Sequence, residues 1–280
     1  MEAPLDDLVF GLTLGVDDAP TRAALEELCT LIGEDAHCRV QPTCVASPEA
    51  LAEGLASGAV HVGWISPTLL LIAPELATIV PLLASVRQGV AAFHSVVFSA
   101  ESSPIRTLGD LPGRRAAWVH ATSASGYLVP RLTLVRQGVD VTTVFAHEAF
   151  YETHGGVVEA VFDGVADVGA TYAHFEAGDA SRPLFRTGCE DARPGSRPRI
   201  LAVSGPIPSD MIVAHPGVPL ATRVAFAGAL CRLPSDPVGH GALRRVVGAD
   251  DFAPVSIAAL EELEALKSAS RDLLHQAPAR

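Results

Sequence analysis

Short apolar runs alternate along the chain with stretches in which apolar residues recur every three or four positions. Apolar runs of this length predict buried strands, and the wider spacing predicts amphipathic helices. We expect strands at residues 8–14, 38–40, 60–64, 77–82, 94–98, 115–119, 142–146, 166–171, 200–203 and 211–214. We expect helices at residues 20–32, 48–58, from 67 onward, 126–137, 156–163, 219–233, 239–247 and 255–275. This alternation is typical of an α/β protein whose mainly parallel sheets are flanked by helices.

Two proline-marked segments, 101–104 and 204–208, interrupt the alternation. We interpret them as the two hinge crossings of a two-lobed protein. Residues 1–99 with 206–280 would form lobe 1, and residues 100–205 would form lobe 2. In α/β folds, ligands bind where strand ends and helix N-termini converge, so we expect the binding site between the lobes.

Residues 118–127 place a cluster of hydroxyl side chains between a strand and a helix. Thr122, Ser123 and Ser125 follow the expected strand, and helical spacing of apolar residues begins at Tyr127. The first N–H groups of a helix lack intrahelical acceptors and form the positive end of its dipole, so they attract anions. The same residue types also serve as plain helix caps. The fragment alone therefore leaves an anion site and a simple cap both open.

The composition restricts the classes of function. The chain has 20 basic and 32 acidic residues, a net charge of −12, which argues against nucleic-acid or anionic-membrane partners. Lys267 is the only lysine and lies in an expected charged C-terminal helix, which argues against a Schiff-base enzyme or a phosphate-loop NTPase, because each needs a placed lysine. There is no asparagine, which leaves Ser, Thr, His, Arg, carboxylates and the backbone for polar recognition. An anionic ligand would be held by local dipoles against the overall field.

The cysteines and the N-terminus bear on the compartment. The five cysteines lack metal-site spacing and favour reduced thiols, although a disulfide between Cys38 and Cys44 stays open. No basic segment precedes the first apolar run, so we expect the chain as written to be cytoplasmic, or periplasmic if a leader was removed. The apolar stretch 67–86 contains Pro74, Glu75 and Pro81, which predicts protein core rather than a membrane span.

Five segments in order carry a resemblance to a known family. They are 58–67 (GAVHVGWISP), 103–113 (SPIRTLGDLPG), 123–128 (SASGYL), 153–171 with its His154, and 204–210 (SGPIPSD). Together they resemble the phosphonate/phosphate/phosphite substrate-binding proteins of ABC transporters, which have the type II periplasmic binding protein fold. The resemblance runs from about residue 55 to 213.

The resemblance implies roles for particular residues. Ser123, Ser125 and the N–H groups around Ala124 would hold the oxygens of an anion, and His154 would donate a further hydrogen bond. Asp210 would face a ligand amine, as an acid does in relatives.

The sequence also departs from the family at several positions. Ala124 stands where the family has a threonine, and Pro48 and Phe93 stand where aminophosphonate binders have tyrosines. His174 lies near the position of a second acid, and His61 replaces an aspartate of the first-lobe strand. The part of the pocket that binds the oxyanion therefore looks retained, whereas the part that binds the amine looks rebuilt.

Four further residues are candidate ligand contacts, each with a plainer interpretation. Ser66, at a helix start of lobe 1, could contact the anion from the opposite side or simply cap its helix. Tyr172 and His174 follow a strand and could line the rim of the site. Phe93 could form a wall of the site or belong to the core.

Two other patterns suggest structure rather than chemistry. His120, His147, His154 and His174 lack the tight spacing of a zinc site, so we expect no metal and no cofactor. The acidic run 260–266 is typical of an amphipathic helix whose charged face is solvated.

We therefore expect a monomeric solute-binding protein that closes on a small phosphonate- or phosphate-like anion. It would serve an ABC permease or a sensor, without chemistry, nucleic acid or membrane insertion. The alternative is a cytoplasmic biosynthetic enzyme on the same fold, resembling the chorismate dehydratases or the thiamine-pyrimidine synthases. The rebuilt pocket and the free cysteines favour that alternative, whereas the lack of a clear acid/base pair beyond His154 with Asp210 or Glu148 argues against it.

Overall fold

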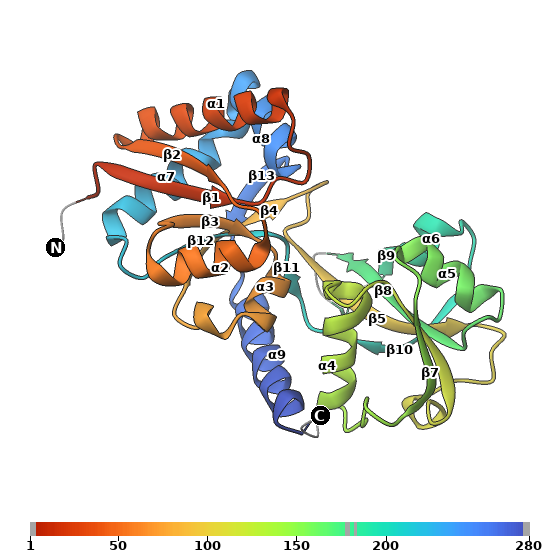
Figure 1. Ribbon diagram of the computed structural model, residues 1–280. Helices are drawn as coiled ribbons and strands as arrows, with labels where there is room; N and C mark the ends of the chain where they lie inside the picture. Colours follow the sequence, from red (N-terminus) through yellow and green to blue (C-terminus); the bar gives the residue numbers. More distant parts are fainter. Residues whose placement is uncertain (1–3, 177–179, 182–183, 277–280) are drawn as a thin grey trace. The chain divides into compact units, whose positions relative to one another are not determined.

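The computed structural model describes residues 4–176, 180–181 and 184–276 (Figure 1). By its internal contacts the chain divides into two compact units. The first unit comprises Met1–Ala91 and Pro208–Ser256, and the second comprises Ala92–Ile207 and Ile257–Arg280. Each unit contains one mixed sheet with helices packed against it.

In the first unit, the described strands form a sheet in the order β13-β4-β12-β3-β1-β2. The strands are β1 (Asp7–Leu12), β2 (Arg39–Cys44), β3 (Val62–Ile65), β4 (Val80–Val86), β12 (Met211–Ala214) and β13 (Asp251–Pro254). The helices are α1 (Ala19–Ala36), α2 (Pro48–Ser57), α3 (Pro67–Ile72), α7 (Leu220–Arg232) and α8 (Pro237–Val247), with single turns η1 (Pro74–Leu76) and η5 (Leu233–Ser235).

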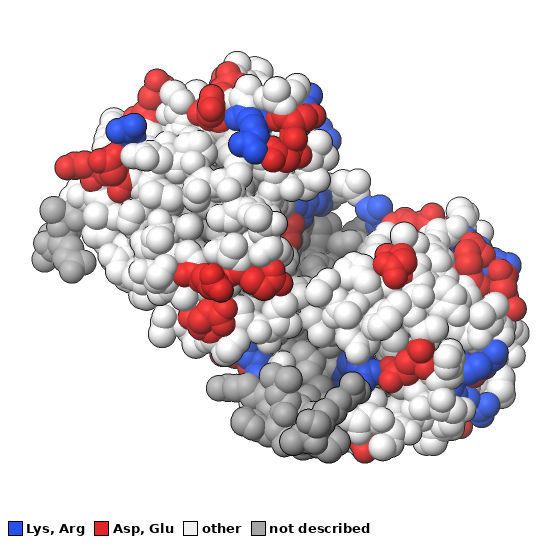
Figure 2. Space-filling view, viewed as in Figure 1, with Lys and Arg blue, Asp and Glu red and all other residues white. Residues whose placement is uncertain are grey.

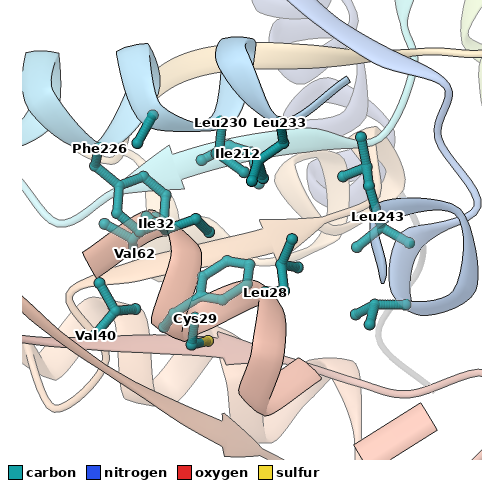
Figure 3. Close-up of a cluster of buried hydrophobic side chains, with 14 of the residues drawn as sticks. Leu28, Cys29, Ile32, Val40, Val62, Ile212, Phe226, Leu230, Leu233 and Leu243 are labelled. Atoms are coloured by element: carbon teal, nitrogen blue, oxygen red, sulfur yellow. The ribbon is translucent and has the colours of Figure 1, made fainter. Parts of the chain in front are cut away.

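The core of the first unit lies between this sheet and helices α1, α7 and α8 (Figure 3). Leu28 and Ile32, four positions apart on α1, are fully buried, as the helical spacing predicts. Phe226 of α7 packs against Phe10 of β1 with ring centroids 5.6 Å apart. Each side chain of this size stabilises the fold by roughly 1.5–3 kcal/mol when it is fully buried.

In the second unit, the main sheet has the strand order β10-β5-β8-β6-β7, with β9 paired to β8 and β11 to β5. The strands are β5 (Ala92–Ala100), β6 (Arg114–Trp118), β7 (Phe145–Phe150), β8 (Val168–Phe175), β9 (Leu184–Thr187), β10 (Pro198–Val203) and β11 (Ile207–Pro208). The helices are α4 (Val129–Arg136), α5 (His154–Phe162), α6 (Gly188–Ala192) and α9 (Ile257–Gln276), with a single turn η2 (Leu108–Asp110) and a π-helical turn η3 (Ala124–Leu128) that runs directly into α4.

The unit boundaries differ from the expected lobes. β5 belongs to the second unit because it pairs with β8 and β10, so the first boundary falls between Ala91 and Ala92 rather than at residue 99. α9 also belongs to the second unit, because Glu262 accepts hydrogen bonds from Arg136 at 2.8 Å and from the Gly205 N–H at 2.9 Å. Glu262 is only 9% exposed, which corrects the expectation that the whole acidic face of this helix is solvated.

The sheets are also less parallel than expected. β1 pairs in parallel with β2 and β3, and β6 pairs in parallel with β7 and β8. The strands next to the connections between the units, β4, β5, β10 and β12, pair antiparallel with their neighbours. Parallel pairing is therefore confined to the part of each sheet that is built by strand–helix–strand repeats.

Two surface properties follow from the described residues. None of their helices is both long enough and apolar enough to span a bilayer. Acidic side chains occur on both units in the face shown in Figure 2, as expected for a chain with a net charge of −12.

Candidate functional site

The candidate site lies where the parallel strands β6 and β7 end side by side. Beyond the strand ends, the Tyr151 N–H donates to the Trp118 carbonyl at 2.9 Å and the Glu152 N–H donates to the Val119 carbonyl at 2.8 Å. β6 then leads into η3 and α4, and β7 leads into α5. Two helices therefore begin at the same edge of the sheet, which brings their N-termini close together.

The first helix start holds the predicted serines. Ser123 is the N-cap residue, and its Oγ accepts from the Gly126 N–H at 3.1 Å. Because that oxygen is the acceptor, the Ser123 hydroxyl proton stays free to donate. The amides of Ala124 and Ser125 lie in the first helical turn, where the helix provides no acceptor. The site thus offers several uncharged donors from three consecutive residues.

A buried hydrogen bond fixes the backbone of this turn. The Ser95 hydroxyl of β5 donates to the Ser125 carbonyl at 2.8 Å, and the Ser95 N–H donates to Ser204 Oγ at 2.8 Å. Ser95 is 2% exposed. The first turn is therefore attached to the middle of the sheet rather than to a mobile loop.

The second helix start presents His154 to the same place. His154 is the first residue of α5, and its Nε2 lies 3.5 Å from the Ser125 Oγ. Its Nδ1 lies 3.0 Å from the Thr171 Oγ1 of β8. The structure thus brings Ser123, Ala124, Ser125 and His154 together in one unit, at the ends of two helices.

His154 is neutral at physiological pH in this setting. Burial, together with a smaller effect of the nearby His120, lowers its pKa from an ordinary 6.5 to about 4. A neutral imidazole has one N–H donor and one acceptor nitrogen. Recognition by these residues consequently relies on dipoles, with no buried counter-charge.

The lowered pKa of His154 predicts a pH-dependent contribution to stability. The unfolded chain binds a proton on this residue below about pH 6.5, whereas the folded chain binds it only near pH 4, so stability falls as the pH drops through this window. We expect the unfolding free energy of the native protein to lose about 3 kcal/mol relative to His154→Gln between pH 7 and pH 4. Urea denaturation at several pH values measures this difference. The matched control is His147→Gln, at an exposed position on β7. An equal pH dependence in the His154→Gln variant and the native protein would contradict the expectation.

Tyr172, His174 and Phe93 lie in the same unit as the serines. The His154 and Tyr172 rings meet edge to face with centroids 5.0 Å apart, and Tyr172 and His174 are 5.8 Å apart. Ser95 is paired with Tyr172 in the β5–β8 ladder, and Phe93 lies two positions before Ser95 on β5. Because side chains alternate along a strand, Phe93 and Ser95 point to the same face of the sheet. Phe93, Tyr172 and His174 are all half-buried.

Tyr172 is held by charged neighbours of its own. Its hydroxyl donates to Asp191 of α6, which also accepts from the Arg186 Nε at 2.9 Å. Burial and the hydrogen bond to Asp191 together raise the pKa of Tyr172 to about 12. The phenol therefore stays protonated and fixed in orientation.

Ser66 and Asp210 belong to the first unit. Ser66 is exposed at the N-cap of α3 and makes no capping hydrogen bond with its side chain. Asp210 accepts a hydrogen bond from Arg87 at 2.8 Å in an ion pair. An aspartate whose charge is already balanced by an arginine is a poor counter-ion for a ligand amine.

Several residues around the site were not predicted from the sequence. Thr171, Ser95 and Asp191 contact predicted residues from other strands or from α6, at positions set by sheet register. Thr171 lies within the apolar run of its strand, where a lone threonine gives no functional signal. α6 lies between the strands expected at residues 166–171 and 200–203, where we expected no helix.

The described residues contain neither a metal-ligand cluster nor a disulfide. Within them, no cluster of three His, Cys, Asp or Glu side chains is arranged to hold a metal ion. The five cysteines, all of them described, are free thiols. Burial raises the pKa of Cys29 and of Cys189 to about 12, which makes both poor nucleophiles.

The fold and the site together define a solute-binding protein of the type II periplasmic binding protein class. The chain belongs to the family of periplasmic substrate-binding proteins of phosphonate ABC transporters, whose family model matches residues 10–260. Family membership gives the chain a solute-binding role, with a small ligand and a permease as partner. It gives no support to the alternative of a biosynthetic enzyme.

Solved structures share the fold over nearly the whole chain. XAC2383 from Xanthomonas citri, solved bound to ATP, is 21% identical with a TM-score of 0.69 over 97% of this chain and 99% of that one. PhnD1 from Prochlorococcus marinus, solved with methylphosphonate, is 14% identical with a TM-score of 0.56 over 96% of this chain and 98% of that one. The aliphatic sulphonate binding protein SsuA from Escherichia coli is 18% identical with a TM-score of 0.51 over 98% of this chain and 93% of that one.

Proposed function

We propose that the chain binds a small ligand through a tetrahedral oxyanion group of the phosphonate or phosphate type. The observation that carries the proposal is the meeting of two helix N-termini, where His154 Nε2 lies 3.5 Å from Ser125 Oγ. A ligand oxygen placed beside these atoms accepts from His154 and from the Ser125 hydroxyl, in the direction that both helix dipoles favour. The amides of Ala124 and Ser125 and the hydroxyl of Ser123 serve the other oxygens.

Uncharged donors suit a protein that must release its ligand. A buried arginine or lysine would bind an anion as an ion pair, and an unoccupied site would then hold an unpaired buried charge. Preplaced N–H and O–H groups avoid that cost and still select oxygens by direction. The structural neighbours support the oxyanion class, since ATP, methylphosphonate and aliphatic sulphonates all carry tetrahedral oxyanion groups.

In this proposal the ligand does not need an amine group. Asp210, the residue that the family resemblance assigned to an amine, is paired with Arg87. Tyr172, His174 and Phe93 offer half-buried ring surface instead, which suits an alkyl or other uncharged substituent.

The chain in this proposal acts as a monomer in the periplasm and delivers its ligand to an ABC permease or, alternatively, to a sensor. Its net charge of −12 disfavours nucleic acid as a partner. The transport role is supported by the family match, because that family consists of substrate-binding proteins of ABC transporters.

Calorimetric titration of ligand-free protein tests the proposal. We expect phosphate or methylphosphonate to bind, and 2-aminoethylphosphonate to bind no more tightly than methylphosphonate. Dimethyl methylphosphonate, whose charge is removed by esterification, is the matched control and should not bind. The proposal is wrong if no phosphate, phosphonate or sulfonate binds, or if the neutral ester binds as tightly as the anion.

A further inference from the structure

Thr171 is a buried hydroxyl residue whose only described side-chain hydrogen bond is to His154. It lies on β8, is 0% exposed, and its Oγ1 is 3.0 Å from the His154 Nδ1. Gly188 at the start of α6 leaves room for the same hydroxyl, since a Cβ at residue 188 would lie 2.0 Å from it. The hydroxyl is therefore enclosed between the imidazole of His154 and the backbone of α6.

We propose that Thr171 is a positioning residue that donates its hydroxyl proton to the His154 Nδ1 and so holds the imidazole as the Nε2–H tautomer. This inference rests on the proposed function, because it sets the direction of one hydrogen bond to the oxyanion. The tautomer of a neutral histidine is determined by the partner of its other nitrogen. With the Nδ1 accepting from Thr171, the proton is on Nε2, which is the nitrogen near Ser125.

The opposite tautomer would oppose anion binding. If Nδ1 carried the proton and donated it to Thr171, the Nε2 lone pair would face the ligand oxygen. Protonation of both nitrogens is disfavoured, because burial holds the pKa of His154 at about 4. A neutral imidazole at this position therefore favours anion binding only when its Nε2 carries the proton.

The surroundings restrict the orientation of the ring as well. Tyr172 meets the imidazole edge to face, at an interplanar angle of 83°. Tyr172 is itself fixed by its hydrogen bond to Asp191. The imidazole therefore packs against a phenol ring whose own position is fixed.

Two substitutions at residue 171 separate the hydroxyl from the shape of the side chain. Thr171→Val keeps the shape and removes the donor, whereas Thr171→Ser keeps the donor. Thr133→Val is the control, because Thr133 is also a buried threonine of this unit whose hydroxyl donates to a backbone carbonyl at 2.8 Å, on α4. The readouts are the imidazole 15N chemical shifts of His154 in ligand-free protein, assigned by comparison with His154→Gln, and the affinity for methylphosphonate.

We expect the native protein and Thr171→Ser to show the Nε2–H tautomer and similar affinities. Thr171→Val should show loss of that single tautomer and bind roughly tenfold or more weakly, while Thr133→Val keeps the native tautomer and affinity. An Nδ1–H tautomer in the native protein, or a native tautomer and affinity in Thr171→Val, would overturn the inference. Should Thr171→Val not fold, the spectra of the native protein and of Thr171→Ser still decide. Failure of the proposed function would show differently, as absence of ligand binding by the native protein.

Discussion

Replacing Ser123 and Ser125 together by alanine is expected to weaken the binding of methylphosphonate by at least about 100-fold. Each hydroxyl supplies one hydrogen bond to an ionised oxygen, and such bonds contribute roughly 1.5–3 kcal/mol each. Both side chains are 8% exposed, so water does not readily take the place of the lost donors. Calorimetry on the double variant and on each single variant measures the loss.

A matched control separates ligand binding from helix capping. Ser47 caps α2 by accepting from the Ala50 N–H at 3.2 Å, as Ser123 does for Gly126 at 3.1 Å. Loss of either cap should lower stability by roughly 1 kcal/mol. Of these two cap substitutions, only Ser123→Ala should weaken ligand binding. Equal affinities in Ser123→Ala, Ser125→Ala and Ser47→Ala would mean that the serines are plain structural residues.

The second large effect is expected at Gly126, where the helix start touches the end of β6. A Cβ at this residue would lie 2.2 Å from Val119 Cγ2 and 2.6 Å from Val119 Cβ. Val119 is itself tied to the turn, since its N–H donates to the Gly126 carbonyl at 3.2 Å. Alanine must push the first turn off the strand, and we expect a loss of about 3 kcal/mol in the unfolding free energy together with loss of anion binding.

Gly241 provides the contrasting glycine. It lies in α8, is exposed, and a Cβ there would meet no atom within 4 Å. Gly241→Ala should therefore stabilise the protein by up to about 1 kcal/mol, through helix propensity and a less flexible unfolded chain. Urea denaturation of both variants measures the two effects. A Gly126→Ala variant as stable as the native protein would show that the turn adapts without cost.

The local parts of the site could be predicted from the sequence because local rules determine them. Hydroxyl residues followed by helical apolar spacing predicted a helix from residue 126, and the structure begins it at Ala124. The resemblance to the family added His154 to the serines, and the structure brings their side chains together. Helix capping and apolar periodicity depend on residues that are close in the chain, so both can be recognised in a single sequence.

The contacts between distant segments could not be predicted in this way. The pairing of Arg87 with Asp210 joins residues 123 positions apart. Amphipathic spacing predicted a helix near the C-terminus but not the unit on which α9 packs, which depends on Glu262 and its two partners. The serine and proline residues at 101–104 form a turn after β5, with the Ser103 N–H donating to the Ala100 carbonyl, and turns of this composition look like crossings in a sequence.

A crystal structure of the protein grown with methylphosphonate tests the central claim most directly. The claim is that uncharged donors at the starts of two neighbouring helices bind the oxyanion. We expect phosphonate oxygens within about 3.2 Å of the amide nitrogen of Ser125, the hydroxyls of Ser123 and Ser125, and the Nε2 of His154. A phosphonate bound elsewhere, with these groups making no contact to it, would contradict the account.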